Sequence, residues 1–159
     1  MPWSSISDMS TARYTPAATR DDKGNLYAIG GENVNFSTVA TVEKWNGSSW
    51  SSIPDMPTAR DDLGATRDDK GNLYAIGGRD VNFDPVATVE KWDGSSWSSI
   101  PDMASRRVGI AAASDDKGNV YAIGGYGRAF DYDPTATVEK YTPPKPVPTA
   151  PSGLTATQL

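Results

Sequence analysis

The 159-residue sequence contains no cysteine and no histidine. Disulfides, thiolate nucleophiles, imidazole bases and zinc sites built on those ligands are therefore excluded. Long apolar runs are also absent, and no stretch approaches the roughly 18 consecutive apolar residues of a membrane span. The formal net charge of −5 argues against nucleic acid, whose binding needs a basic face. We therefore expect no metal, no cofactor, no membrane contact and no nucleic-acid partner.

An internal repeat of 47 residues dominates the sequence. The segment Tyr27–Gly31 (Tyr-Ala-Ile-Gly-Gly) recurs at 74–78 and 121–125, and three tryptophans at 3, 50 and 97 each open a Trp-Ser-Ser-Ile segment. Aligning 3–49 with 50–96 gives 36 identical residues of 47, whereas the third unit is more diverged and carries two extra residues before Val138. A period between 40 and 50 residues is typical of propeller blades.

Each unit predicts four short strands, which in the first unit cover 17–20, 26–29, 40–45 and 50–53. The dipeptide Asn46-Gly47 between the last two is a strong hairpin signal, and Asp22–Asn25 forms a tight turn between the first two. Helical periodicity is absent. The sequence therefore predicts an all-β chain of four-stranded units.

Several details of these units resemble kelch repeats. A double glycine ends the second strand, an aromatic residue closes the third, a tryptophan opens the fourth, and a Met-x-x-x-Arg motif leads into the next unit (Met9/Arg13, Met56/Arg60, Met103/Arg107). The resemblance covers residues 1–141, with repeats starting at 3, 50 and 97. It implies a kelch-type β-propeller with three four-stranded blades per chain, half of a six-bladed ring.

The ends of the chain predict how such a half-ring closes. The chain begins on a fourth strand, Trp3–Ile6, and ends on a third strand, Val138–Tyr141. Three blades turn half a circle, so these two strands cannot meet within one chain. We expect a homodimer in which Trp3–Ile6 pairs with Val138–Tyr141 of the other copy, because this removes every unpaired edge. A nine-bladed trimer and an excised or engineered piece of a longer chain are the alternatives.

Residues 142–159 differ in composition from the repeats. The Pro-rich stretch after Tyr141 is typical of a stiff linker, and 151–159 resembles the opening strand of a fibronectin type III domain. That resemblance implies a multidomain bacterial parent protein that is secreted or held at the cell surface. On this chain we expect the segment to be an unstructured tail.

Most differences between the three units fall on one face. In an antiparallel blade the loop from strand four to the next strand one shares a face with the loop from strand two to strand three. Loops on a rigid scaffold are where binding residues usually lie. We expect this face to bind a protein or carbohydrate partner through Tyr14, Glu32, Asp61, Asp62, Arg79 and Tyr126. Drift after a recent duplication is the alternative explanation.

Three arginines, Arg13, Arg60 and Arg107, persist within the varying loops. The kelch resemblance places them at the mouth of the central channel, where six would ring the opening of a dimer and bind carboxylate or phosphate. The alternative is structural: each arginine satisfies backbone carbonyls or a neighbouring Asp between blades.

Catalysis is the weaker interpretation of the sequence. The copper site of galactose-oxidase-like enzymes needs His and Cys, and the sialidase-like turn 114–121 has Arg20 and Arg67 in place of its Ser in the other units. A glycosidase carboxylate pair could be drawn from Asp61, Asp62, Asp80 and Asp131, but nothing singles out two of them. We expect an interaction scaffold, not an enzyme; a fragment of a secreted carbohydrate-active enzyme of sialidase or oxidase-like type is the alternative.

Overall fold

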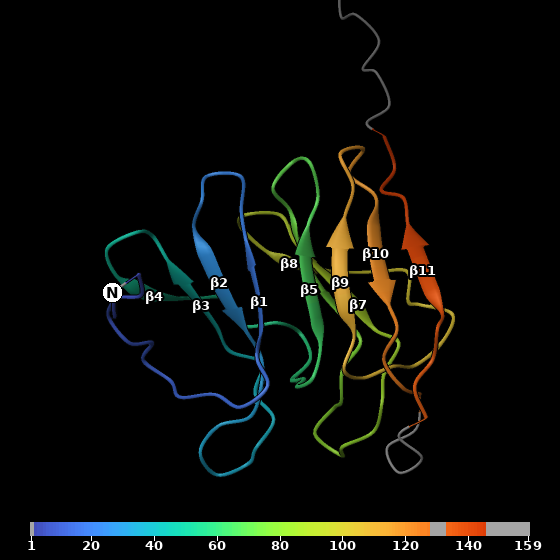
Figure 1. Cartoon of the computed structure of the whole chain (residues 1–159), viewed down its shortest axis with the longest axis horizontal. Coiled ribbons are helices and arrows are strands. Elements are labelled where there is room, and N and C mark those ends of the chain that lie inside the picture. The colour runs from blue at the N-terminus through green and yellow to red at the C-terminus, as the bar shows by residue number, and fades with distance from the viewer. Residues whose placement is uncertain (1, 128–132, 146–159) are drawn as a thin grey trace, which may run out of the picture.

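Three antiparallel sheets, here called blades 1 to 3, make up the chain in the computed structural model, which describes residues 2–127 and 133–145 (Figure 1). Blade 1 contains β1 (Ala17–Arg20), β2 (Leu26–Ile29), β3 (Val42–Trp45) and β4 (Trp50–Ile53). Blade 2 contains β5 (Gly64–Arg67), β6 (Leu73–Ile76), β7 (Val89–Trp92) and β8 (Trp97–Ile100). Blade 3 contains β9 (Ala111–Ser114), β10 (Val120–Ile123) and β11 (Val138–Tyr141). The described residues contain no helix, so the all-β, blade-like prediction is confirmed.

Two predicted elements differ from the structure. The third strand of the first unit begins at Val42 rather than Ala40, because the Ala40 carbonyl accepts a hydrogen bond from the Met56 N–H instead of joining the strand ladder. The segment Trp3–Ile6, expected to be a strand, has no strand structure in the single chain. A strand needs a neighbour to satisfy its backbone groups. The expected neighbour, β11, lies at the opposite end of the molecule (Figure 1).

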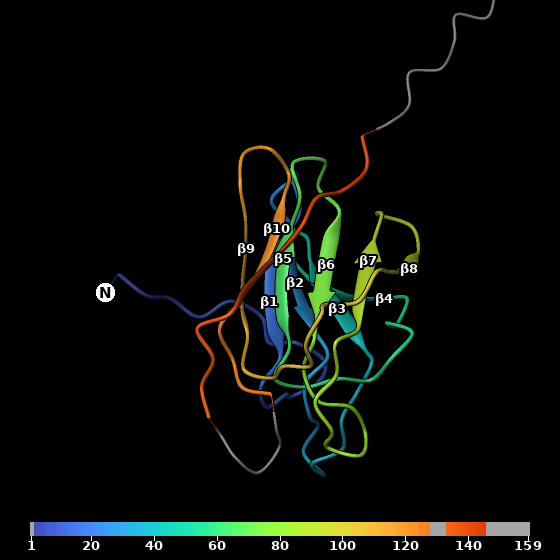
Figure 2. The ribbon, with the colours of Figure 1, turned by 90° about the vertical axis from the view of Figure 1, so that its right-hand side faces the viewer.

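The blades stand side by side around their first strands, with β5 between β1 and β9, while the later strands of each blade extend away from them (Figures 1 and 2). The core lies between blades. One cluster joins blades 1 and 2 (Ile29, Val42, Met56, Leu73, Trp92) and a second joins blades 2 and 3 (Tyr74, Ile76, Val89, Ile110, Val120). Strands such as Leu73–Ile76 are apolar throughout because both of their faces are buried.

The repeated Asp-Asp-Lys-Gly-Asn turn has a structural role. In blade 1 the carboxylate of Asp21 accepts hydrogen bonds from the N–H groups of Lys23 and Asn25, from the Asn25 amide and from the Tyr27 hydroxyl. Gly24 within this turn has a φ of +84°, which favours glycine. Burial raises the pKa of Asp21, but these hydrogen bonds outweigh it and the net pKa is lowered. Blades 2 and 3 repeat the same bonds. The turn geometry therefore explains why the Asp-Asp-Lys-Gly-Asn sequence is identical in all three units.

The two sets of loops lie at opposite ends of the blades, as predicted. The β1–β2, β5–β6 and β9–β10 turns share one end, and the loops that follow β2, β6 and β10 share the other (Figure 1). At this second end each incoming loop pairs with the loop after the second strand through a single bridge: Tyr14 with Glu32, Asp61 with Arg79, and Val108 with Tyr126. This end is called the loop face below.

Candidate functional site: a loop face and two blade ends

The three repeated arginines are buried inside their own blades. The Nη1 of Arg60 donates to the carbonyls of Gly77 and Thr88, at 2.8 and 2.9 Å, and its Nη2 pairs with Glu90. Arg13 makes the same bonds with Gly30, Thr41 and Glu43, and Arg107 with Gly124, Thr137 and Glu139. Each guanidinium therefore holds the end of the second strand of its blade to the beginning of the third.

This arrangement contradicts the expectation that the arginines present a ring of positive charge to solvent. The guanidinium groups are shielded from water, and each faces a carboxylate of its own blade. Burial lowers the pKa of Arg60, and the charge of Glu90 opposes that effect. The structural alternative describes these residues better, with two corrections: the partner is Glu43, Glu90 or Glu139 rather than an Asp, and the bonds lie within one blade rather than between blades.

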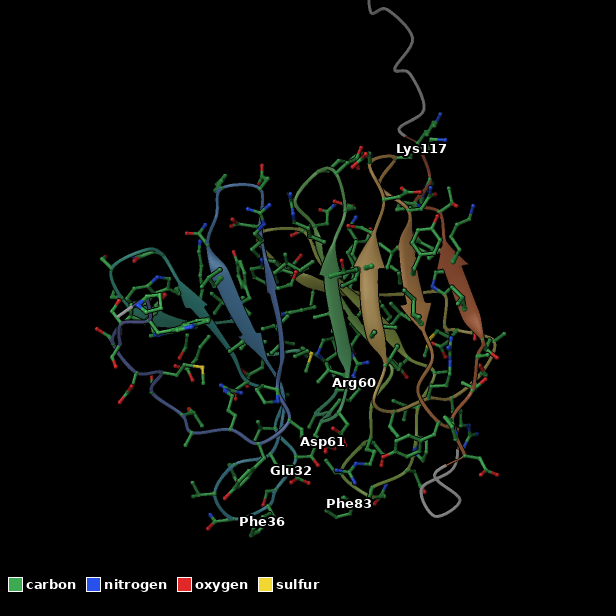
Figure 3. All side chains as sticks on the ribbon, viewed as in Figure 1. Glu32, Phe36, Arg60, Asp61, Phe83 and Lys117 are labelled. Atoms are coloured by element: carbon green, nitrogen blue, oxygen red, sulfur yellow. The ribbon has the colours of Figure 1, made fainter. Side chains whose placement is uncertain are left out.

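Four of the predicted loop residues come together on the loop face, where Figure 3 labels two of them, Glu32 and Asp61. Arg79, which follows β6, forms a hydrogen-bonded ion pair with Asp61 and lies 3.3 Å from Asp62 and 3.7 Å from Glu32 of blade 1. Thr15 of blade 1 also donates to Asp61, at 3.4 Å. The group thus bridges blades 1 and 2 and contains three carboxylates against one guanidinium.

The charges of this group are partly withdrawn from water. The side chain of Asp61 is fully shielded and one of its oxygens, Oδ1, has no hydrogen-bond partner, whereas Asp62 and Arg79 are partly exposed. Burial raises the pKa of Asp62; Arg79 opposes this and Asp61 adds to it. The hydrogen bond that Arg79 donates to Asp61 raises the pKa of Arg79. The carboxylates outnumber the cation, so the group attracts positive charge.

Exposed aromatic side chains flank the charged group. Tyr14 stacks on Phe36, with ring centroids 5.3 Å apart and planes within 6°, and the Arg79 guanidinium lies over Phe83 at 5.6 Å. Phe36 is 63% and Phe83 46% exposed, and both have a positive φ, +58° and +63°. A bulky side chain rarely adopts this conformation. The sequence reasoning missed both residues because they are identical between units, although the repeated Val-Asn-Phe segment signalled them.

The other predicted residues lie apart from this group. Tyr126 occupies the equivalent position in blade 3, where its backbone pairs with that of Val108. Asp80 accepts the N–H groups of Asn82 and Asp84 and thereby shapes its own loop. Asp131 lies outside the described residues. Asp61 is thus shielded and paired with Arg79, whereas Oδ1 of Asp80 is engaged by its own loop.

Blades 1 and 3 each expose apolar residues whose equivalents in the other two blades are buried. Leu26 of blade 1 is 42% exposed, although its equivalents Leu73 and Val120 are at 0% and 2%. At the other end Ile123 and Val138 are 40% and 55% exposed, whereas the equivalent residues of blades 1 and 2 are buried (Ile29, Ile76, Val42, Val89). The surface around Leu26 is called the leading end and the surface around Ile123 and Val138 the trailing end. Each has the composition of an interface between blades.

No protein-family model matches the chain, and no curated protein matches it. Within the described residues there is no cluster of three acidic side chains arranged to hold a metal ion. The same part of the chain contains no helix that could cross a membrane.

Proposed function

We propose that the protein is an interaction scaffold, a kelch-type half-propeller that pairs with a second copy to close a six-bladed ring and binds partners through its loop face. The observation that carries the proposal is the exposure of Leu26 at the leading end and of Ile123 and Val138 at the trailing end, at positions buried wherever two blades meet. Burial of a Leu, Ile or Val side chain contributes about 1.5–3 kcal/mol. Joining the leading end of one copy to the trailing end of another covers both surfaces.

Backbone hydrogen bonds between blades support the same closure. The N–H of Gly31 donates to the Arg60 carbonyl of the next blade at 2.9 Å. The N–H of Gly78 likewise donates to the Arg107 carbonyl of blade 3. In a ring of two chains, the equivalent pair is the N–H of Gly125 with the Arg13 carbonyl of the second copy. The leading and trailing ends therefore match in polar groups as well as in apolar surface.

Sedimentation velocity on the full chain tests this closure. At micromolar concentration we expect one species of twice the chain mass of 16.9 kDa. A single species at the chain mass would contradict self-association. A species of three times that mass would replace the six-bladed ring by the nine-bladed trimer.

The loop face supports a positively charged protein segment as the partner. Glu32, Asp61 and Asp62 outnumber Arg79 there, and Phe36 and Phe83 offer exposed aromatic surface beside them. Charge of one sign with adjacent aromatic rings suits lysine or arginine side chains, which bind carboxylates and pack against ring faces.

Titration of the full chain with a lysine-rich octapeptide at low salt tests this surface. We expect binding that is weakened at least fivefold in a variant with Glu32→Gln and Asp62→Asn. A variant with Asp22→Asn and Asp69→Asn, which removes equal charge from the opposite loops, is the matched control and should bind as the parent does. Equal weakening by both variants, or preferential binding of a neutral oligosaccharide, would overturn the assignment.

A further inference from the structure

Two tryptophans that open the last strands of blades 1 and 2 are held in the same way. The indole N–H of Trp97, in β8, donates to the Pro54 carbonyl at 2.9 Å, and that of Trp50, in β4, donates to the Ser7 carbonyl at 3.0 Å. Each indole also packs against the aromatic residue opposite it in the sheet, Trp92 or Trp45, with centroids 5.6 Å apart. The acceptor is in both cases 43 residues earlier in the chain. The Trp97 bond joins the outer strand of blade 2 to the end of blade 1, and the Trp50 bond joins the outer strand of blade 1 to the N-terminal segment.

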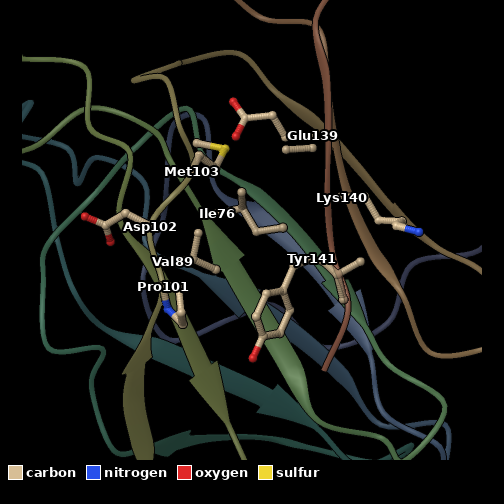
Figure 4. Close-up of a pocket in the computed structure, with 10 residues that line it drawn as sticks. Ile76, Val89, Pro101, Asp102, Met103, Glu139, Lys140 and Tyr141 are labelled. Atoms are coloured by element: carbon tan, nitrogen blue, oxygen red, sulfur yellow. The ribbon is translucent and has the colours of Figure 1, made fainter. Parts of the chain in front are cut away.

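Blade 3 has a pocket where this tryptophan would lie (Figure 4). The pocket is lined by Ile76, Val89, Pro101, Met103 and Tyr141, among others. The corresponding residues one repeat earlier surround Trp97: Ile29, Val42, Met56 and Trp92 belong to the cluster on which Trp97 packs, and Pro54 accepts its indole hydrogen bond. The walls of an indole site are therefore repeated at blade 3.

The chain does not supply a tryptophan to this pocket from its own blade 3. Its five tryptophans are at 3, 45, 50, 92 and 97, and residues 146–159 contain no aromatic residue. Trp3, the first residue of the remaining Trp-Ser-Ser-Ile segment, is 90% exposed, and Ile6 of the same segment is 56% exposed. Ser7, which follows the segment, accepts the indole hydrogen bond of Trp50 in blade 1.

We propose that the blade 3 pocket is a binding site for the Trp3–Ile6 segment of a second copy, whose Trp3 fills the pocket and donates its indole N–H to the Pro101 carbonyl. The inference rests on the proposed ring and identifies the residue that closes it. The register follows from blade 1, where Trp45 faces Trp50 and Val42 faces Ile53, and blade 2 repeats it. Tyr141 of one copy would therefore face Trp3 of the other, and Val138 would face Ile6. This pairing also satisfies the outer backbone edge of β11.

The test uses the full chain with Trp3→Ala and Trp3→Phe. We expect Trp3→Ala to raise the dimer dissociation constant at least a hundredfold and Trp3→Phe to raise it less, because phenylalanine fills part of the pocket without an indole donor. Val81→Ala, which shortens another exposed apolar side chain (61% exposed) in the middle blade, is the control and should leave the constant unchanged. A Trp3→Ala chain as dimeric as the parent would overturn the pocket assignment and leave the ring proposal standing.

A peptide of residues 2–8 separates the two proposals. Added to the Trp3→Ala chain, it should bind with a blue shift of its tryptophan fluorescence, as an indole does when it leaves water. If the parent is monomeric yet the Trp3→Ala chain binds the peptide, the pocket assignment is supported and ring closure fails. If the peptide does not bind the Trp3→Ala chain, the pocket does not take this segment and the inference is overturned.

Discussion

Arg60 and Glu90 form an ion pair of 2.8 Å whose side chains are 0% and 1% exposed. Removal of one member leaves a buried charge without its partner, which costs about 3–5 kcal/mol. We expect Arg60→Met to lower the free energy of unfolding by that amount, and the double variant Arg60→Met/Glu90→Leu to lose clearly less than the sum of the two single changes. Urea unfolding of the four proteins measures this coupling; additive losses would show that the pair acts as two independent groups.

Acid should lower the free energy of unfolding through Glu43 and Glu139, which pair with Arg13 and Arg107. Burial raises the pKa of Glu43, but hydrogen bonds from Ser10 and Arg13 outweigh it and lower the net pKa; Glu139 behaves likewise with Ser105, Ala104 and Arg107. A folded pKa below the unfolded value of about 4.3 gives stability that is present above that pH and is lost as pH falls through the folded pKa. We expect urea midpoints to fall below about pH 4.3, and to fall less steeply in Glu43→Gln. Parallel pH profiles for parent and variant would contradict this role.

Phe36 should contribute little to folding. At φ +58° any residue with a Cβ pays about 1–2 kcal/mol of strain, which glycine avoids. We expect Phe36→Gly to unfold at a higher temperature than Phe36→Ala, since both lose the ring stacked on Tyr14 but only alanine keeps the strain. The midpoint temperatures of thermal unfolding of the two variants measure this difference. An alanine variant more stable than the glycine variant would show that the backbone at Phe36 is unstrained.

Gly77 and Gly124 occupy equivalent positions but should respond differently to substitution. A Cβ on Gly77 would lie 2.7 Å from the Arg107 carbonyl and would also contact Ile110, both in blade 3. Among the residues that the structure describes, a Cβ on Gly124 would meet only the Thr135 carbonyl, at 3.5 Å. We expect Gly77→Ala to unfold the chain, and Gly124→Ala to preserve the circular dichroism spectrum while separating the dimer, because its Cβ would meet Arg13 of the second copy. A Gly124→Ala chain that stays dimeric would argue against closure at this end.

The fold was predictable because its signals are local. Tyr-Ala-Ile-Gly-Gly, Asn46-Gly47 and the Asp21 turn each specify strands and turns within a few residues, and the 47-residue period repeats them. The arrangement of the arginines was not predictable in the same way. Arg60 meets Glu90, 30 residues later, across a blade, and periodicity alone does not reveal that pairing. The repeated Val-Glu-Lys segment could have suggested it, because both partners recur in every unit.

The candidate site was predictable only in part, for a related reason. Comparing units by their differences identified Glu32, Asp61, Asp62 and Arg79, which the structure brings together. The same comparison could not find Phe36 and Phe83, which do not differ between units, and gave no indication that their backbone φ is positive. Exposure is set by the loop conformation and by which blade face is covered, and both require the three-dimensional arrangement.

An engineered disulfide tests whether two copies close the ring by exchanging Trp3–Ile6. The chain contains no cysteine that could compete with the engineered pair. In blades 1 and 2, Lys44 faces Ser51 and Lys91 faces Ser98, so closure places Lys140 of one copy opposite Ser4 of the other. Facing strand residues lie within the Cα separation that a disulfide spans. A pair moved by one residue, Ser5→Cys/Lys140→Cys, is the matched control because its side chains point to opposite faces.

The measurement is the mass of oxidised Ser4→Cys/Lys140→Cys protein on a non-reducing gel. If two copies close the ring, we expect a covalent dimer of twice 16.9 kDa. The dimer should be reversed by a reducing agent and absent from the Ser5→Cys/Lys140→Cys control. Protein that remains at the chain mass with both thiols free, or equal cross-linking of the two variants, would contradict closure of the ring by exchange of Trp3–Ile6.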